Sequence, residues 1–224
     1  MKKILSALVL GILMIGQFAV MAQSVQISRS DYSSATVRFV APELDFTILD
    51  ANGTAYTQLV MEGAAPSAVI GQPNLPVLSQ LIEIPVCNSV AVRVQVNQTK
   101  ALSSLKYPVM PVQPAPSKSD RKARPFAIDS AFYALDTDLC AHAWVETLGV
   151  GRDRNLAMLR ISPVFYDPVS GAISIATDMT ITLAYEGADA AATEQLHSRY
   201  YSPDFALGGS LLISSSTIDL TGKE

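Results

Sequence analysis

The stretch Val-Ala-Val-Arg-Val-Gln-Val-Asn at residues 90–97 decides the fold class, because apolar and polar side chains alternate along it. Successive side chains of a strand point to opposite faces of a sheet, so the valines share one face and the polar residues share the other. Residues 179–185 repeat this pattern, with Thr180 and Thr182 facing outward. Both stretches are predicted to be half-buried strands of an antiparallel sheet.

Turn residues fall between the apolar runs where hairpins need them. The Asn-Gly pair at residues 52–53 separates residues 46–49 from residues 55–60, and Asn-Gly supplies the positive φ angles of a tight reversal. A second turn at residues 166–171 separates residues 156–161 from the strand that follows. Many short strands with such spacing predict an all-β fold, an antiparallel β-sandwich.

The amino terminus has the pattern of a secretory signal peptide. Within residues 1–22 two lysines precede a long apolar run that ends at Ala22. A membrane anchor is the alternative, since the run approaches the roughly 18 residues that span a bilayer. Gln17 interrupts the run, and the small-residue exit favours cleavage. We expect an exported chain without a membrane span, in the periplasm or outside the cell.

Charge excludes one class of function. The chain has 16 basic and 20 acidic residues, and residues 1–22 hold two lysines and no acid. The remaining 14 basic and 20 acidic residues give a net charge of −6, which disfavours nucleic-acid binding. The histidines, cysteines and aspartates lack the spacing of zinc or calcium sites, so no metal or cofactor is predicted. Trp144 lies on a predicted strand and is expected in the core.

The two cysteines leave two interpretations open. A disulfide between Cys87 and Cys140 would close a loop of about 50 residues and stabilise the fold by about 3 to 4 kcal/mol. Two buried thiols that behave as small hydrophobic groups fit the sequence equally well. A catalytic role for Cys140 with His142 is not expected, because no oxyanion hole is suggested nearby.

The sequence predicts a chain of three parts. Residues 1–22 are the signal peptide, residues 23–187 form the sandwich, and residues 188–224 are a linker or contain a short helix. The alanine-rich residues 188–199 are the best helix candidate, and a linker is the equal alternative.

A proline-rich segment interrupts the strand pattern. Residues 107–125 contain five prolines, which remove backbone donors and favour extended geometry. Within it, residues 117–124 read Ser-Lys-Ser-Asp-Arg-Lys-Ala-Arg and offer no large apolar side chain to a core. This stretch is predicted to be an exposed, protease-sensitive basic loop.

An ordered set of short segments resembles the prodomains of the gingipains, the caspase-like cysteine peptidases of the C25 type. The set begins with Gly-Gln-Pro-Asn-Leu-Pro at residues 71–76 and is closest in pattern to the lysine-specific branch. The other matching segments are residues 81–86, 92–94, 110–111, 117–120, 125–126, 161–168 and 181–189. The likeness covers most of residues 30–205.

The resemblance implies a β-sandwich that assists the folding of a C25 protease and blocks its active site until it is cleaved away. Gingipains select arginine or lysine before the scissile bond, so the inhibitory residue is expected to be a cation. By its order in the motif, that residue is Lys118, flanked by Ser117, Ser119 and Asp120. The implied partner is the catalytic domain of a C25-type cysteine protease.

Three further basic residues compete for this role or mark processing sites. They are Arg121, Lys122 and Arg124. Pro125 hinders cleavage after Arg124, because a prolyl nitrogen disfavours the usual protease geometry. Arg121 and Lys122 are therefore the predicted cut points.

No catalytic domain is recognisable in this chain, so it is not predicted to be an enzyme. Three interpretations stay open: a prodomain or inhibitor, the amino-terminal part of a protease zymogen, and a stand-alone β-sandwich module of the cell surface. The third would bind a ligand such as carbohydrate through exposed aromatic residues, for which Tyr200 and Tyr201 are candidates.

Overall fold

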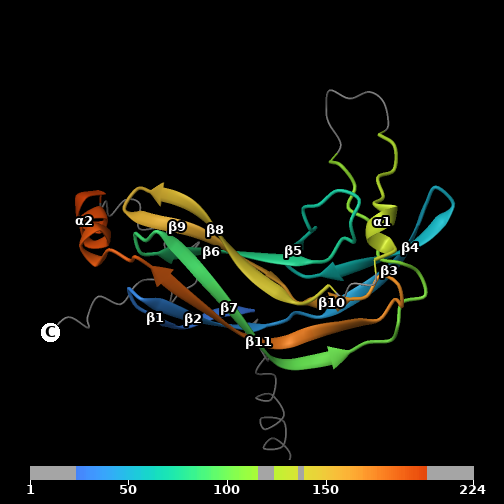
Figure 1. The fold of residues 1–224 in the computed structure, drawn as a ribbon, viewed down its shortest axis with the longest axis horizontal. Helices are drawn as coiled ribbons and strands as arrows, with labels where there is room; N and C mark the ends of the chain where they lie inside the picture. Colours follow the sequence, from blue (N-terminus) through green and yellow to red (C-terminus); the bar gives the residue numbers. More distant parts are fainter. Residues whose placement is uncertain (1–23, 116–123, 136–138, 201–224) are drawn as a thin grey trace, which may run out of the picture.

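The computed structural model describes residues 24–115, 124–135 and 139–200 of the 224-residue chain. Most of these residues lie in strands (Figure 1). In chain order the elements are β1 (Val25–Ser30), β2 (Ser34–Val40), β3 (Leu44–Ala51), β4 (Thr54–Met61), β5 (Ala64–Ala65), β6 (Val77–Ile84), β7 (Ser89–Ala101), α1 (Ser130–Tyr133), β8 (His142–Gly151), β9 (Arg154–Ser162), β10 (Val164–Tyr166), β11 (Ile173–Glu186) and α2 (Ala190–Tyr200).

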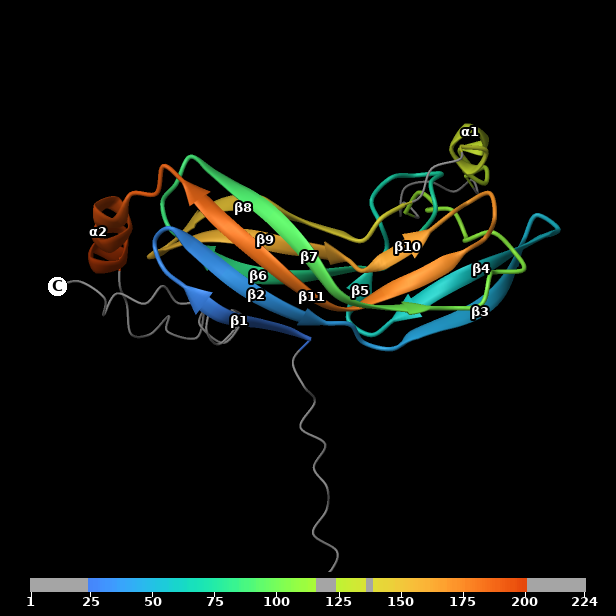
Figure 2. The same cartoon turned by 60° about the horizontal axis from the view of Figure 1, so that its bottom comes forward.

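Two antiparallel sheets face each other, which confirms the all-β sandwich. The first sheet has the order β1-β2-β11-β10, with β7 paired to β11 as well. The second has the order β5-β6-β9-β8, and β3 pairs with β4 as a separate two-stranded ribbon. Figure 2 shows that strands of both sheets run along the long axis of the molecule.

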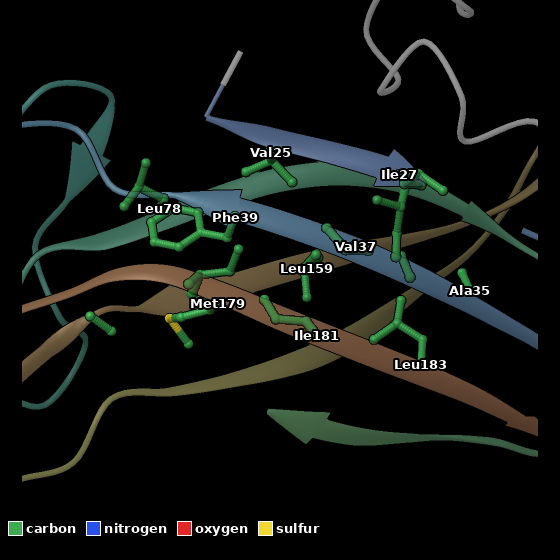
Figure 3. Close-up of a cluster of buried hydrophobic side chains, with 14 of the residues drawn as sticks. Val25, Ile27, Ala35, Val37, Phe39, Leu78, Leu159, Met179, Ile181 and Leu183 are labelled. Carbon is green, nitrogen blue, oxygen red and sulfur yellow. The ribbon is translucent and has the colours of Figure 1, made fainter. Parts of the chain in front are cut away.

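The main core fills the space between the sheets, where alternate side chains of facing strands meet (Figure 3). Val37, Phe39, Met179 and Ile181 come from the first sheet and Leu159 from the second, and all five are fully buried. Removing each such side chain from water contributes roughly 1.5 to 3 kcal/mol. The alternation along β11 is the predicted one, with Thr180 and Thr182 on the outward face.

The first predicted hairpin is confirmed and the second is corrected. Asn52 and Gly53 join β3 to β4 with φ angles of 54° and 76°. Residues 166–171, however, join β10 to β11, whereas β9 pairs with β6 and β8 in the other sheet. The chain changes sheets at Pro163, which has no N–H to donate to a ladder.

Helix α2 confirms the helix candidate and lies at one end of the sandwich (Figure 1). Asp189 donates its backbone N–H to Val86 O at 2.7 Å, and the Thr193 hydroxyl accepts the Val86 N–H at 2.9 Å. Thr193 itself is buried. The helix is therefore built onto the sandwich, beyond the boundary predicted at residue 187. No helix among the described residues is long and apolar enough to cross a bilayer.

Candidate functional site

The predicted loop is flanked by two segments, residues 108–113 and residues 124–129, which are called its first and second limbs. The first limb is held against the sandwich. The Thr57 N–H donates to Pro108 O and the Met110 N–H donates to Thr57 O, both at 2.8 Å. Val109 between them bridges to β4 in parallel and is completely buried. This part of the proline-rich segment is therefore packed on β4 and hydrogen-bonded to it.

Two phenols complete the hydrogen bonding of Val109. The Tyr133 hydroxyl donates to Val109 O at 2.6 Å, and the Tyr166 oxygen accepts the Val109 N–H at 3.1 Å. Burial is the main cause that raises the pKa of both tyrosines, so both remain protonated at physiological pH. The base of the loop thus rests on a second apolar cluster, which contains Val109, Tyr166 and Leu75.

Gly71 holds both limbs at once. Its N–H donates to Val112 O, and its carbonyl accepts the Asp129 N–H, both at 2.9 Å. Its φ angle of 85° lies in the left-handed region, and a Cβ atom here would come within 3.0 Å of the Asp129 nitrogen. The glycine that opens the Gly-Gln-Pro-Asn-Leu-Pro motif is therefore required where the two limbs approach the same backbone.

One side chain bonds the first limb directly to the second. The Gln113 amide donates to Ala127 O at 2.8 Å and accepts the Ala127 N–H at 3.0 Å, so it joins the two limbs in both directions. The Phe126 ring packs on Tyr56 of β4 with centroids 5.5 Å apart. Nothing in the sequence pattern pointed to Gln113, because a glutamine in a proline-rich segment is normally solvated.

Of the residues predicted for inhibition and processing, only Arg124 lies in the part of the chain that the structure describes. Ser117, Lys118, Ser119, Asp120, Arg121 and Lys122 lie outside the described residues. Arg124 is described and is exposed, directly before Pro125. The structure therefore defines the two limbs that flank most of the basic residues in the sequence: Gln113 bonds Ala127, and Phe126 packs on Tyr56.

The disulfide left open by the sequence does not form in this fold. Cys87 follows the end of β6 that pairs with Asn155, and Cys140 precedes the start of β8, which pairs with Ser162. Seven residues of β9 separate these positions, which is about 23 Å along a strand and far beyond the reach of a disulfide. Burial raises the pKa of the Cys87 thiol, opposite to the shift that a nucleophilic thiolate needs.

Trp144 lies on β8 as predicted, but not in the core. Its side chain is on the outer face of the sheet, 36% exposed, and it stacks on His142 with ring centroids 5.0 Å apart. Strand β8 is an edge strand whose inward positions are taken by residues such as Val145. The tyrosine side chains proposed for ligand binding lie outside the described part. Within the described residues no cluster of three acidic, histidine or cysteine side chains is suited to a metal ion.

Comparison with known proteins identifies the family of this scaffold. The family model Propeptide_C25 matches residues 20–199. Lys-gingipain HG66 of Porphyromonas gingivalis is 31% identical over 183 residues, which are 80% of this chain and 11% of that protein. A second Lys-gingipain of P. gingivalis is 29% identical over 221 residues, 92% of this chain and 13% of that protein. The chain thus spans about an eighth of these relatives or less.

Two solved structures share the fold. One, which concerns the zymogenic latency of gingipain K from P. gingivalis, has a TM-score of 0.64 and 28% identity and covers 73% of this chain and 93% of that one. The other, a complex of the pro- and mature domains of P. gingivalis RgpB, has a TM-score of 0.61 and 18% identity and covers 80% and 96%. The matches fall on the propeptide and not on a catalytic domain: this chain belongs to the family of C25 peptidase propeptides.

Proposed function

We propose that this chain keeps a C25-type cysteine protease latent by placing the Lys118 side chain in the specificity pocket of the catalytic domain. The observation that supports this is the construction of the loop base. Backbone bonds through Thr57 and Gly71 and the side chain of Gln113 fix both limbs to a rigid sandwich. A scaffold of this kind presents the intervening basic residues at little cost in conformational entropy.

The sign of the charge supports the same role. The mature chain carries a net charge of −6, yet the loop sequence from residue 117 to 124 holds four cations and one acid. A lysine that enters a pocket with a buried acidic group forms a desolvated ion pair, whose loss costs much more than that of a surface pair. Pairing of this kind favours a lysine-specific protease as the target, in keeping with the relatives named above.

The same loop is proposed to be the site of processing. Cleavage after Arg121 or Lys122 would cut the loop on the carboxyl side of Lys118, and the Arg124–Pro125 bond would resist cleavage. The propeptide would then lose the closed loop that presents Lys118, and inhibition would weaken. Export by the amino-terminal signal peptide places this activity outside the cytoplasm, in the periplasm or beyond the cell.

Titration of a lysine-specific C25 catalytic domain with the mature chain tests the proposal. Lys118→Ala is expected to raise the inhibition constant by about 100-fold, because the pocket keeps an unpaired buried acid. Lys100→Ala, on an exposed position of β7, is the matched control and should leave it unchanged. Equal inhibition by wild type and Lys118→Ala would assign the inhibitory role to another residue. No inhibition by the wild-type chain would remove the proposal.

A further inference from the structure

A hollow of about 570 Å³ lies beside the base of the basic loop, on the outer face of the β5-β6-β9-β8 sheet. It is lined by the segment after β5, including Val69 and Pro73, and by Val77 of β6. Trp144 of β8 and Phe132 of α1 also line it. The side chains that line the hollow are largely apolar, which is unusual for a surface open to water.

The charged groups at the rim are already paired with neighbours. Arg160 donates to the Glu146 carboxylate at 3.0 Å and to the Ser79 hydroxyl at 3.1 Å. The His142 ring stacks on Trp144, and its Nδ1 lies 2.9 Å from Cys140 O. The electrostatic complement of this hollow is therefore an uncharged, apolar group, in contrast to the cationic loop beside it.

Exposed apolar side chains occur in or next to the segments that line the hollow. Val69 and Ile70 are 53% and 55% exposed, and Ile128 and Leu135, on either side of α1, are 42% and 51% exposed. Figures 1 and 2 both place α1 at the end of the sandwich away from α2. Such a group of exposed apolar residues is the usual mark of an interaction surface.

The hollow is continuous with the base of the loop. Gly71 bonds both limbs, and the next two residues, Gln72 and Pro73, line the hollow. Asp129 is held by Gly71 and caps α1, whose Phe132 lines the hollow. A protein that receives a side chain from the loop would bring its surface to this end of the sandwich, beside the hollow.

We infer that this hollow is a second docking point for the same protease, and that it receives an apolar side chain, aromatic or branched, from the surface of the C25 catalytic domain. This inference rests on the proposed function. A two-point attachment separates the tasks: the cation on the loop selects the pocket, and the apolar contact supplies affinity that does not depend on the protease's choice of lysine or arginine. The lining has the composition of a binding hot spot, because it includes a tryptophan.

The affinity of the mature chain for the mature domain of Lys-gingipain provides the first test. Trp144→Ala is expected to raise the dissociation constant by about 30-fold, the loss at which a residue counts as a hot spot. Val69→Ser, in the segment after β5, should raise it by several-fold and guards against a folding defect of the tryptophan variant. Val150→Ala is the matched control, because Val150 is 61% exposed at the far end of the same strand. It should change the constant by less than twofold.

Trp144 is the only tryptophan in the chain, which gives a direct spectroscopic readout. Incorporation of 5-fluorotryptophan gives one ¹⁹F resonance, and this resonance should shift and broaden when the unlabelled catalytic domain is added. Inhibition by the wild-type chain with an unmoved resonance and an unchanged constant for Trp144→Ala would overturn the inference and leave the proposed function intact. A shift caused by oligosaccharides but not by the catalytic domain would also overturn it. Failure of the wild-type chain to bind at all would remove both.

Discussion

The two ends of the sandwich are built by different chemistry. At the α2 end, the fully buried carboxylate of Glu83 bonds His197 Nε2 at 2.7 Å and Arg154 at 2.9 Å. At the loop end, the limbs are fixed by backbone hydrogen bonds, by the neutral amide of Gln113 and by phenols. Buried charge joins one helix to the sheet, whereas uncharged groups hold the part that carries the cations.

This difference separates stability from function. A buried carboxylate that bonds an arginine and a histidine has little tolerance for change, because the loss of one partner leaves a buried polar group without compensation. The loop base distributes its bonds over many backbone groups, so a single substitution there should alter the position of the loop more than the stability of the whole fold.

Glu83→Ala is expected to lower the free energy of unfolding by about 3 kcal/mol, because Arg154 and His197 both lose their buried acceptor. Denaturant titration of the mature chain measures the effect. Glu146→Ala is the matched control, since Glu146 pairs with Arg160 on the surface with 54% of its side chain exposed. That change should cost no more than about 0.5 kcal/mol. Equal losses for the two variants would show that the buried triad has no special weight at the α2 end.

Gly71→Ala is expected to cost about 2 kcal/mol, since the new Cβ meets the Asp129 nitrogen and the backbone keeps a positive φ angle. The damage should be local: the Met110 and Val112 amides, both bonded in the first limb, should exchange with solvent faster than amides of β11. Gly53→Ala has a similar φ angle but open space around its Cβ. It should cost about 1 kcal/mol and leave those two amides protected.

Some features of this fold could be predicted from the sequence and others could not. Strands with strict alternation, such as β7 and the second half of β11, were predictable because periodicity reports directly which face is buried. The exposure of Trp144 follows the same alternation, since Val145 faces inward, but a tryptophan on a strand was expected in the core for its size. The separation of Cys87 from Cys140 could not be predicted, because it follows from the register of β9.

The candidate site shows the same limit. The motif at residues 71–76 marked the right place, since its glycine holds both limbs, although the sequence alone did not indicate what it contacts. The Gln113 bonds to Ala127 and the Glu83 triad join residues 14 to 114 positions apart. Local patterns carry no signal for such pairs, so both required the fold.

Asp31 offers a test by pH at the α2 end. Its carboxylate accepts the Ser33 hydroxyl at 2.6 Å and the Ser33 and Ser34 N–H groups at 2.8 Å, and these bonds, the Ser33 hydroxyl first, lower its pKa from 3.8 to about 2. A lowered pKa stabilises the fold above the unfolded value, and the gain is lost as the pH falls from about 4 to about 2. Because the side chain is one-third exposed, Asp31→Asn should cost only about 1 kcal/mol at pH 7.

The measurement is the difference in unfolding free energy between wild type and Asp31→Asn as a function of pH. It should be constant from pH 7 to about 5 and should then shrink toward zero near pH 2. A difference that persists unchanged at pH 2 would mean that shape, not charge, gives Asp31 its role. The loop end should show no comparable dependence from Gln113, whose amide does not titrate.

Gln113→Ala is expected to have the smallest effect on global stability, below about 1 kcal/mol, because its bonds to Ala127 are partly exposed. Its effect should appear in the loop instead: nicking by trypsin after Arg121 or Lys122 should become about fivefold faster, the equivalent of about 1 kcal/mol in opening of the contact between the two limbs. Gln113→Glu is the matched variant, because a carboxylate still accepts the Ala127 N–H but repels the Ala127 carbonyl. An intermediate rate for Gln113→Glu would show that both halves of the bond hold the limbs together. Equal rates for all three chains would mean that the backbone bonds of Thr57 and Gly71 hold the loop base without help from Gln113.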